Sequence, residues 1–469
     1  MRVKLTVLGG GGARIPALVR AVVGERPTKF DRIDLFEPSP ARRASLGRLS
    51  VELAGALGSP GTVRLVDGLA EALTGADYVF SAVRVGGDDA RIVDEQVALE
   101  RGIVGQETQG PGGCAMALRT IPVVLAYCDV LARVAPAATL VNFTNPAGII
   151  TQAITRHGKV RAVGVCDTPS QTFTRIVEFL GADPGQVTFS YAGLNHLGWI
   201  SSVVEDGNER IDELVAHYGD LKAFNHRFAF DPDLVRRLRA IPTEYLYYYY
   251  DSAAYLAGVS RAGTSRGQDV KRFNESMVAR VAQAFSDGDV HDAWATYSSV
   301  LSARRASNMR IDFAGQRADI DGASGAPQGS TPVTDPLTGG DRKIGGYEGV
   351  ALRVIDGLSG AAPARIVVNT RNGPTLDFLD ADDVVEVPAL VDALGIAPLA
   401  NTGLEGASRG LVLQVKEYER AVVEAAITGD AELAALALAL HPLVPGVTAA
   451  RELMAAYRDA HRPYLDYLR

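Results

Sequence analysis

A run of four glycines near the N-terminus, set between segments of different periodicity, constrains the fold more than any other feature. Residues 3–8 form a mostly apolar, β-branched segment, and the glycines at 9–12 follow at once. Helical spacing of apolar residues begins near Pro16, and a second strand-like segment at 32–36 ends on Glu37. Consecutive glycines let the backbone turn tightly where a strand passes into a helix. This order predicts a β-α-β unit, the building block of a parallel sheet.

The same alternation continues to about residue 190. Strand-like segments recur, separated by stretches with helical spacing, at 63–66, 78–83, 139–143 and 162–165. We therefore predict an α/β fold in which residues 1–190 form a Rossmann-like, doubly wound domain of the lactate and malate dehydrogenase kind. Residues 191–469 lack this alternation and predict a mainly helical α+β domain with a catalytic and oligomerisation role. Within it, the segment from about 322 to 341 is rich in Gly, Pro, Ser and Thr and predicts a long surface loop.

Charge and composition exclude several classes of function. The formal net charge of −8 and the pI near 5.5 argue against nucleic-acid binding, which needs clustered Lys and Arg. We see no signal peptide, and no apolar run approaches the roughly 20 residues of a membrane span; the longest covers residues 434–440. Cys114, Cys128 and Cys166 are too few and too scattered for a disulfide framework. We expect a cytoplasmic protein with reduced thiols and no nucleic-acid or membrane partner.

The glycine run also predicts a nucleotide site. Glycines at the end of a first strand allow close approach of a pyrophosphate to a helix N-terminus, and Glu37 could accept hydrogen bonds from a ribose. A carboxylate there favours NAD over NADP, whose 2′-phosphate it would repel. The motif is imperfect, because Arg14 or Ile15 stands where a third glycine is usual. A plain tight turn is the alternative, and Arg42 or Arg43 could instead contact a 2′-phosphate.

A cysteine and a histidine predict a metal site. Cys166 follows a strand and precedes Asp-Thr-Pro, which places it at the carboxyl edge of the sheet, where doubly wound proteins bind ligands. Asn142, Asn145 and Arg84 follow other strands to the same edge. A thiolate and an imidazole, that of His196 in Gly-Leu-Asn-His-Leu-Gly-Trp, suit a borderline divalent metal. Taken singly, a buried cysteine or histidine is more often a packing residue.

Several ordered motifs resemble glycoside hydrolase family 4, whose members use NAD and a divalent metal in place of two carboxylates. The resemblance runs from the N-terminus into the C-terminal helices. It is carried by Arg-Val-Gly-Gly at 84–87, Gly-Gln-Glu-Thr-Gln-Gly-Pro-Gly-Gly at 105–113, Asn-Phe-Thr-Asn-Pro-Ala-Gly at 142–148, and the segments around Cys166 and His196. The Cys-Asp-Thr-Pro motif is most similar to the 6-phospho-β-glucosidase branch.

The resemblance implies a reaction without net oxidation. NAD⁺ takes a hydride from C3 of the sugar, the resulting ketone acidifies the C2 proton, and a base removes that proton. The C1 leaving group is then eliminated, water adds to the unsaturated product, and NADH returns the hydride. The metal acts as a Lewis acid on the C2 and C3 oxygens. The expected partner is a small phosphorylated glycoside, and we expect a homodimer or homotetramer.

The resemblance also assigns roles to residues. Cys166 and His196 are expected to bind Mn²⁺ or another divalent metal. Tyr245 is the nominated base, with Tyr247 or a purely structural aromatic face as the alternative, and Asp167 is either the general acid or a helix N-cap. The residues expected at the cofactor are Gly9, Gly10, Gly11, Gly12, Ala13, Arg14, Glu37, Val83 and Asn142. Those expected at the sugar and its 6-phosphate are Arg91, Glu107, Asn145 and Arg266.

Two other classes of function stay open on the sequence. One is a metal-independent 2-hydroxy-acid dehydrogenase, which shares the N-terminal architecture but needs a catalytic His–Asp pair and is usually far shorter. The other is a non-catalytic sensor of NAD or sugar that kept the fold. Loss of function on metal chelation would argue against the first, and loss on substitution of Cys166 or Tyr245 would argue against the second.

Overall fold

The computed structural model describes residues 3–24, 28–315, 346–400 and 404–469. The loop predicted at 322–341 lies outside these residues. The described strands form one 13-stranded sheet, with the main path β10-β8-β7-β12-β11-β6-β5-β4-β1-β2-β3. Half of this path is parallel and comes from the N-terminal part of the chain, and the other half is antiparallel.

The parallel half confirms the doubly wound prediction. Its strands are β1 (Lys4–Leu8), β2 (Arg32–Phe36), β3 (Val63–Val66), β4 (Tyr78–Ser81), β5 (Thr139–Asn142) and β6 (Arg161–Gly164). They pair in parallel in the order β3-β2-β1-β4-β5-β6, in which the direction of winding reverses between β1 and β4. Ligands of open α/β sheets bind at such a reversal, outside the carboxyl ends of the strands.

Helices cover both faces of the parallel half, which is why β1 is buried along its whole length. One core joins the strands to α1 (Ile15–Val23), α3 (Arg48–Ala56) and α17 (Gly346–Leu358). The core on the other face includes α6 (Gly110–Val134) and α7 (Ala147–His157). Each helix turns an apolar stripe toward the sheet, as the helical spacing of the sequence predicts.

The antiparallel half comes from residues far apart in the chain. Its principal strands are β7 (Val187–Leu194), β8 (Leu197–Glu205), β11 (Ala364–Arg371) and β12 (Val384–Asp392). β11 pairs with β6 through Asn369 and Gly164, and β12 pairs with β7 through Glu386 and Gly193. Since Asn369 and Glu386 are themselves paired, these four residues form one row across four strands. The domain boundary predicted at residue 190 falls inside β7, and that division stays a prediction.

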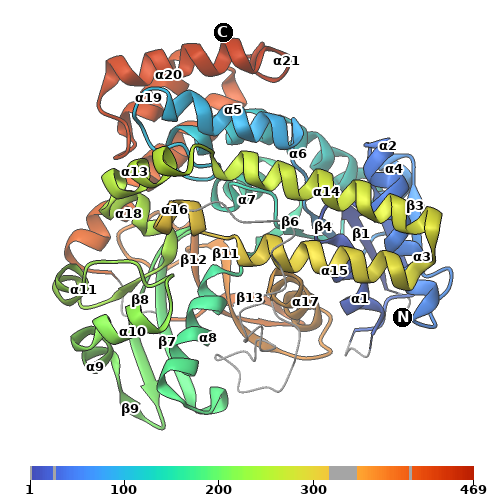
Figure 1. The fold of residues 1–469 in the computed structure, drawn as a ribbon, viewed down its shortest axis with the longest axis horizontal. Helices are drawn as coiled ribbons and strands as arrows, with labels where there is room; N and C mark the ends of the chain where they lie inside the picture. The colour runs from blue at the N-terminus through green and yellow to red at the C-terminus, as the bar shows by residue number, and fades with distance from the viewer. Residues whose placement is uncertain (1–2, 25–27, 316–345, 401–403) are drawn as a thin grey trace.

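Long helices make up most of the remaining C-terminal half, which confirms its mainly helical character (Figure 1). The long helices α14 (Arg266–Asp287) and α15 (Val290–Ala306) lie side by side. Each begins with a capping box, in which the side chain of the cap residue and that of the third helical residue satisfy each other's backbone N–H groups. Near the C-terminus, α18 (Gly406–Thr428) packs on α6, and α20 (Val447–Ala460) packs on α5 (Gly87–Leu99).

The expectation that no apolar segment approaches the length of a membrane span is wrong. The described residues contain one helix, α6, that is long and apolar enough to cross a membrane by length and composition. The apolar-run criterion missed it because glycines, Arg119 and Thr120 interrupt the run. In the structure α6 is mostly buried and contacts α5, α7 and α18. The apolar side chains of α6 are therefore those of a core helix.

Candidate active site

The glycine loop lies at the carboxyl end of β1, and three of its glycines, Gly9, Gly10 and Gly11, have no room for a side chain. A Cβ on Gly10 would come within 2.7 Å of the Leu35 side chain, and one on Gly11 within 2.8 Å of Glu37. Glu37 accepts a hydrogen bond from the Gly11 N–H at 2.9 Å and one from the Ser39 N–H at 2.9 Å. The carboxylate expected at a ribose thus also holds the loop in shape. Each of its oxygens keeps acceptor capacity for a hydroxyl.

The first N–H groups of α1 are already used within the protein. Ala13 and Arg14 connect the glycines to α1, Ile15 donates its N–H to the Gly12 carbonyl at 3.0 Å, Pro16 has none, and Ala17 donates to the Tyr297 hydroxyl at 3.2 Å. The predicted pyrophosphate contact therefore depends on the glycine loop and not on the helix start.

Val83 follows β4 and donates its N–H to the Thr144 hydroxyl at 3.1 Å. Asn142 is fully buried and uses its amide for bonds within residues 142–151. Its side chain therefore shapes the loop after β5, and direct contact with a cofactor stays a prediction.

The two predicted metal ligands, Cys166 and His196, follow β6 and β7, the outer strands of the row of four paired residues described above. Cys166 comes two residues after Gly164, and His196 comes three residues after Gly193 in the turn between β7 and β8. His196 has a left-handed backbone with φ of 62°, an uncommon conformation for a residue with a side chain. Both side chains are at least 95% buried. Among the residues that the structure describes, no group of three His, Cys, Asp or Glu forms a metal site.

Hydrogen bonding fixes which nitrogen of His196 can bind a metal. The Thr108 hydroxyl lies 2.8 Å from His196 Nδ1 and 2.8 Å from Gln106 Oε1. Gln106 Oε1 also accepts the N–H groups of Thr108 and Gln109, and as a carbonyl it can only accept. The hydroxyl proton therefore points to Gln106, and the Thr108 oxygen accepts from Nδ1–H. A neutral imidazole then keeps its lone pair on Nε2, as in metal-binding histidines oriented by a second hydrogen bond.

The protonation states of the pair fit a cation site. Burial lowers the pKa of His196 to about 4, so the imidazole is neutral at physiological pH. Burial, together with the carboxylates of Glu386 and Asp167, raises the pKa of the Cys166 thiol well above its ordinary value. A thiol among carboxylates needs a nearby cation to ionise. This neutral nitrogen and cation-dependent thiol form a donor set that suits a borderline divalent metal.

A buried carboxylate connects the two halves of the pair. Glu386 accepts hydrogen bonds from Tyr191 at 2.6 Å, Asn195 at 2.9 Å and Asn369 at 3.1 Å. Burial raises the pKa of Glu386 to about 7, although these three bonds favour its charged form. Asn195 directly precedes His196, and among the charged groups Glu386 has the largest effect on the pKa of Cys166. The sequence analysis missed Glu386, which carries no motif of its own.

Tyr245 meets His196 ring to ring. The two ring centroids are 3.7 Å apart and the planes are within 5° of parallel. Tyr245 lies in a 3-10 turn, Glu244–Leu246, directly after β10 (Ile241–Pro242). Tyr247, the alternative base, instead packs edge-on against Phe313, with centroids 4.8 Å apart. The geometry therefore favours Tyr245 at the metal pair and an aromatic-core position for Tyr247.

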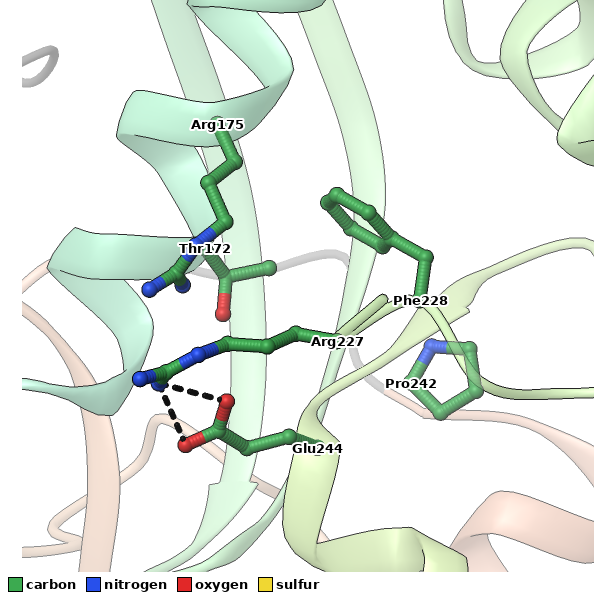
Figure 2. Close-up of a pocket in the computed structure, with 6 residues that line it drawn as sticks. All are labelled: Thr172, Arg175, Arg227, Phe228, Pro242 and Glu244. Carbon is green, nitrogen blue, oxygen red and sulfur yellow. Dashed lines mark hydrogen bonds and ion pairs between the residues drawn. The ribbon is translucent and has the colours of Figure 1, made fainter. Parts of the chain in front are cut away.

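Asp167 stands at the start of α8 (Thr168–Leu180) but its side chain does not cap the helix. Its carboxylate instead accepts a short hydrogen bond from the Gln171 amide. On the same side, Arg227 donates to both oxygens of Glu244 at 2.8 and 3.1 Å. These groups border a small pocket, shown in Figure 2, which is lined by Thr172, Arg175, Arg227, Phe228, Pro242 and Glu244. The pocket was not predicted from the sequence.

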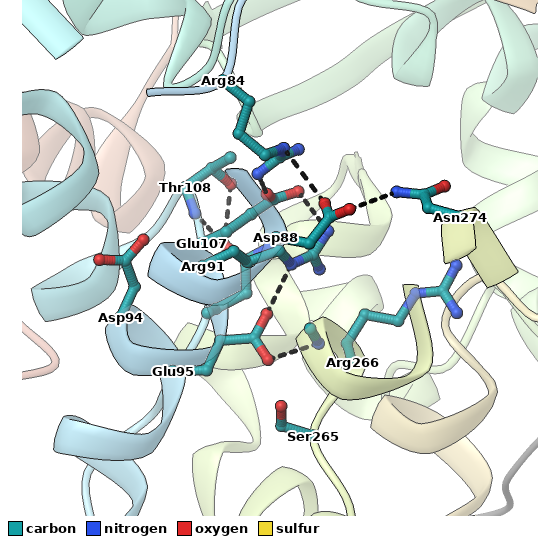
Figure 3. A network of polar contacts seen from close by, with 12 residues as sticks. Arg84, Asp88, Arg91, Asp94, Glu95, Glu107, Thr108, Ser265, Arg266 and Asn274 are labelled. Carbon is teal, nitrogen blue, oxygen red and sulfur yellow. Dashed lines mark hydrogen bonds and ion pairs between the residues drawn. The ribbon is translucent and has the colours of Figure 1, made fainter. Parts of the chain in front are cut away.

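Three of the four residues predicted at the sugar and its phosphate lie in a second arginine-rich cluster (Figure 3). Arg91 donates to Glu95 at 2.9 Å and pairs with Glu107 at 3.1 Å. Glu95 also accepts the Gly267 N–H at 2.6 Å, which links Arg91 to the turn that holds Arg266. Burial opposes ionisation of Glu107, but Arg84 and Arg91 lower its pKa to about 2. The structure thus brings Arg91, Glu107 and Arg266 together.

A carboxylate from each of the two arginine-rich groups affects the pKa of His196. Glu107 belongs to the Arg91 cluster and Glu244 to the Arg227 pocket, and both carboxylates favour the charged form of His196 against burial. Asn145 lies in the loop after β5, and a Cβ on Gly148, at the start of α7, would be 3.1 Å from the Asn195 side chain. The start of α7 therefore packs against the turn that holds His196.

Two family models match nearly the whole chain. Residues 4–182 match the model described as family 4 glycosyl hydrolase, and residues 191–444 match the family 4 glycosyl hydrolase C-terminal domain. The second match alone covers more than half of the chain. It includes His196, Tyr245, Arg266 and Glu386, while the first includes the glycine loop and Cys166.

Individual relatives are similar over their full length. A probable 6-phospho-β-glucosidase of Bacillus subtilis is 29% identical over 98% of this chain and 97% of that protein. A maltose-6′-phosphate glucosidase of Fusobacterium mortiferum is 26% identical over 99% of each. The 6-phospho-β-glucosidase of Thermotoga maritima, solved with manganese, NAD⁺ and glucose-6-phosphate, superimposes with a TM-score of 0.77 at 25% identity, covering 98% of this chain and 99% of that one.

Proposed function

The chain belongs to family 4 of the glycosyl hydrolases, and from this membership we propose that it hydrolyses 6-phospho-β-glucosides with NAD and a divalent metal, with Mn²⁺ as the first candidate. The observation that carries the proposal is the stacking of the Tyr245 ring on the imidazole of His196, the proposed metal ligand. A metal ligand and a tyrosine base are thereby held in one rigid unit. Relatives that act on phosphorylated glucosides, and a relative solved with manganese, NAD⁺ and glucose-6-phosphate, support the choice.

The bound groups would supply two kinds of chemistry: reversible hydride transfer at C3 by the nicotinamide, and polarisation of the C2 and C3 oxygens by the metal. The residues proposed to contact NAD are those of the loop from Gly9 to Arg14, together with Glu37 and Val83. The glycine loop would bind the pyrophosphate. The metal is held by Cys166 Sγ and His196 Nε2.

Tyr245 and Asp167 perform the proton transfers in this proposal. Tyr245, as the phenolate, removes the C2 proton, and a divalent cation at His196 and Cys166 would favour that ionised form. Asp167 protonates the leaving oxygen at C1. Two observations support this role: the Asp167 side chain does not cap α8, and its carboxyl is held by Gln171.

The 6-phosphate is assigned to the Arg91 cluster. Arg91 and Arg266 supply guanidinium donors, which bind phosphate bidentately, and Asn145 and Glu107 bind sugar hydroxyls. Glu107 also balances the charge of Arg84 and Arg91. A preference for the β-anomer follows from the Cys-Asp-Thr-Pro motif and the tyrosine base. Because the Fusobacterium mortiferum relative is a maltose-6′-phosphate glucosidase, the test below includes both anomers.

The test is a chromogenic panel of 6-phospho-β-, 6-phospho-α- and unphosphorylated β-glucosides, assayed with NAD⁺ and Mn²⁺. We expect hydrolysis of the first substrate, and deuterium at C2 of the product when the reaction runs in D₂O. Faster hydrolysis of the α-anomer would overturn the β assignment. Product without deuterium would overturn the elimination route.

Chelation separates the remaining alternatives. Removal of divalent metal by EDTA should abolish hydrolysis, and added Mn²⁺ should restore it. An enzyme that oxidises 2-hydroxy acids and keeps its rate in EDTA would be a dehydrogenase. A protein that binds NAD and sugar phosphate but turns over no glycoside would be a sensor.

A further inference from the structure

A buried histidine near the C-terminus, His441, touches two of the elements that build the candidate site. It directly follows α19 (Ala431–Leu440). Its Nε2 atom lies 3.3 Å from the backbone nitrogen of Gly110, the first residue of α6, and 3.2 Å from the Tyr249 hydroxyl. The Tyr249 hydroxyl also donates a short hydrogen bond to the Gln109 side chain. His441 therefore lies where the segment before α6 meets α12 (Tyr247–Tyr250).

The segment before α6 carries the support of His196. The N–H groups of Thr108 and Gln109 donate to Gln106 Oε1 at 2.7 and 2.8 Å, and the Thr108 hydroxyl donates to the same oxygen at 2.8 Å. The Thr108 oxygen in turn accepts from His196 Nδ1. Gly110 follows this turn directly. A displacement of Gly110 would therefore move the residues that set the tautomer of His196.

The second element carries the proposed base. Tyr249 lies four residues after Tyr245, about one helical turn along the chain. The Tyr245 ring stacks on His196, so the two elements already meet once, at the imidazole of the proposed metal ligand. The contacts at His441 are a second meeting point. One contact lets two segments rotate about it, whereas two contacts fix how they lie relative to each other.

The imidazole of His441 can connect the two elements in either neutral form. Burial lowers its pKa to about 3, so the ring is uncharged at physiological pH. With the lone pair on Nε2, His441 accepts the Gly110 N–H. With the proton on Nε2, it donates to the Tyr249 oxygen, and Nδ1 accepts the Leu443 N–H at 3.2 Å. In both forms a hydrogen bond of Nε2 holds the ring at the junction.

Tyr418 on α18 completes the enclosure of Gly110. Its hydroxyl donates to the Gly110 carbonyl at 3.2 Å. Its ring meets that of His441 edge-on, with centroids 4.5 Å apart. The start of α6 is thus held by polar groups from the C-terminal part of the chain, and the ring that holds it is itself fixed in place.

We propose that His441 is a positioning residue, which holds the segment before α6 against the turn that carries Tyr245. It thereby keeps the Thr108 hydroxyl on His196 Nδ1 and the Tyr245 ring on the same imidazole. The proposal rests on the proposed function, from which the roles of His196 and Tyr245 are taken. The effect of His441 on the metal passes through Thr108, and its effect on the base passes through Tyr249.

Two amide substitutions test the contact of Nε2. The amide of His441→Gln reaches about as far as Nε2, whereas that of His441→Asn reaches only about as far as Nδ1. We expect the Kd for Mn²⁺ to rise about tenfold in His441→Asn, the lower end of the loss caused by removing an outer partner of a metal-binding histidine. His441→Gln should bind nearly normally. His157→Asn, an exposed histidine at the end of α7, is the control and should bind as the unmodified protein does.

The titration uses Mn²⁺ alone, followed by the electron paramagnetic resonance signal of the free ion, and therefore needs no substrate. An unchanged Kd in His441→Asn would overturn the proposal. So would a Gln variant that binds as weakly as the Asn variant, because ring volume and not the contact of Nε2 would then support the site.

A double-mutant cycle distinguishes positioning from a general role in stability. Since His441 is proposed to act through Thr108, His441→Asn should change the Kd for Mn²⁺ by about twofold or less in a Thr108→Val background. Thermal unfolding is measured for every variant. A purely structural histidine would lower Tm and leave the two losses of Mn²⁺ affinity additive, and additive losses would overturn the proposal.

Tyr249→Phe tests the same junction with a smaller change and carries the test if His441→Asn does not fold. It removes one hydroxyl and keeps the ring. We expect the Kd for Mn²⁺ to rise about threefold or more, the size of one hydrogen bond, and this rise to disappear in the Thr108→Val background. An unchanged Kd in Tyr249→Phe would contradict the proposed junction.

Hydrolysis of a 6-phospho-β-glucoside is measured separately, at saturating Mn²⁺, where His441→Asn should still lower kcat because Tyr245 is less well placed. If the unmodified protein hydrolyses no glycoside while the Mn²⁺ affinities follow the expected pattern, the proposed function fails and the positioning role of His441 stands. If hydrolysis occurs without that pattern, the positioning role fails and the proposed function stands. An unmodified protein that binds no Mn²⁺ would overturn both.

Discussion

The imidazole of His196 lies flat against the phenol ring of Tyr245, with ring centroids 3.7 Å apart and planes within 5° of parallel. His196 Nδ1 is held by Thr108 from another part of the chain. The ring of the proposed base is therefore positioned by the ring of the proposed metal ligand. A test of Tyr245 therefore has to remove the phenol hydroxyl while keeping the ring stacked on His196.

Tyr245→Phe removes the hydroxyl and keeps the ring on His196. We expect kcat for a 6-phospho-β-glucoside to fall by about 10² to 10⁴, the usual contribution of a general base. The affinity for Mn²⁺, measured by calorimetry, should stay close to that of the unmodified protein. Tyr247→Phe is the matched control and should have little effect, since its ring packs against Phe313. A larger loss in Tyr247→Phe would reverse the assignment.

Thr108→Val should weaken metal binding without touching the metal ligands. Valine has the shape of threonine but cannot accept the Nδ1 proton of His196, so the tautomer with a free Nε2 loses its support. We expect an increase of about 10- to 100-fold in the Kd for Mn²⁺, measured by calorimetry or by the electron paramagnetic resonance signal of the free ion. Thr108→Ser keeps the hydroxyl and should bind nearly normally. Unchanged Mn²⁺ affinity in the valine variant would contradict the tautomer argument.

Asp167→Asn should affect substrates according to their leaving groups. A general acid matters most when the departing oxygen is a strong base. We expect a large loss of kcat/KM for methyl 6-phospho-β-glucoside and a much smaller loss for the 4-nitrophenyl analogue, whose leaving group departs without protonation. Equal losses on both substrates would indicate a role in binding or in folding of the α8 start.

Glu107 should make the free energy of unfolding fall as the pH is lowered in the acid range. Against burial, Arg84 and Arg91 lower its pKa to about 2 from the ordinary 4.5, so the folded state favours the carboxylate. This contribution is fully present above pH 4.5 and is lost as the pH falls toward 2. The difference corresponds to about 3 kcal/mol.

Urea unfolding at several pH values checks this expectation. The difference in free energy of unfolding between the unmodified protein and Glu107→Gln should be largest at pH 6 and should shrink toward pH 3. The exposed Glu424→Gln serves as the control for removal of a carboxylate. A difference that does not change with pH would mean that Glu107 contributes packing and not charge.

Much of the fold could be predicted because it depends on local pattern. The glycine run and the alternation of strands and helices predicted the doubly wound sheet, and the structure shows its strand order. The sequence could not predict that β11 joins β6, since Asn369 and Gly164 are 205 residues apart along the chain. Pairing of distant strands depends on the shape of the whole core, which a local pattern does not contain.

The candidate site likewise has residues that the sequence could predict and contacts that it could not. Motifs nominated Cys166, His196, Tyr245 and Asp167, and the sheet brings their strand ends to one edge; their catalytic roles stay predictions. The tautomer of His196 is set by Thr108, which lies 88 residues away. Glu386 was missed because a single glutamate in a strand has no signature in the sequence.

By itself, the sequence determined the nucleotide-type fold, the candidate metal pair and the family, because these depend on turn chemistry, periodicity and short motifs with fixed spacing. Only the tertiary structure decided that Tyr245 meets His196, that Asp167 leaves its helix uncapped, and that Arg175 and Arg227 share a pocket. The physical reason is that protonation, hydrogen bonding and charge balance depend on neighbours through space. Those neighbours come from segments that packing, and not the local sequence, brings together.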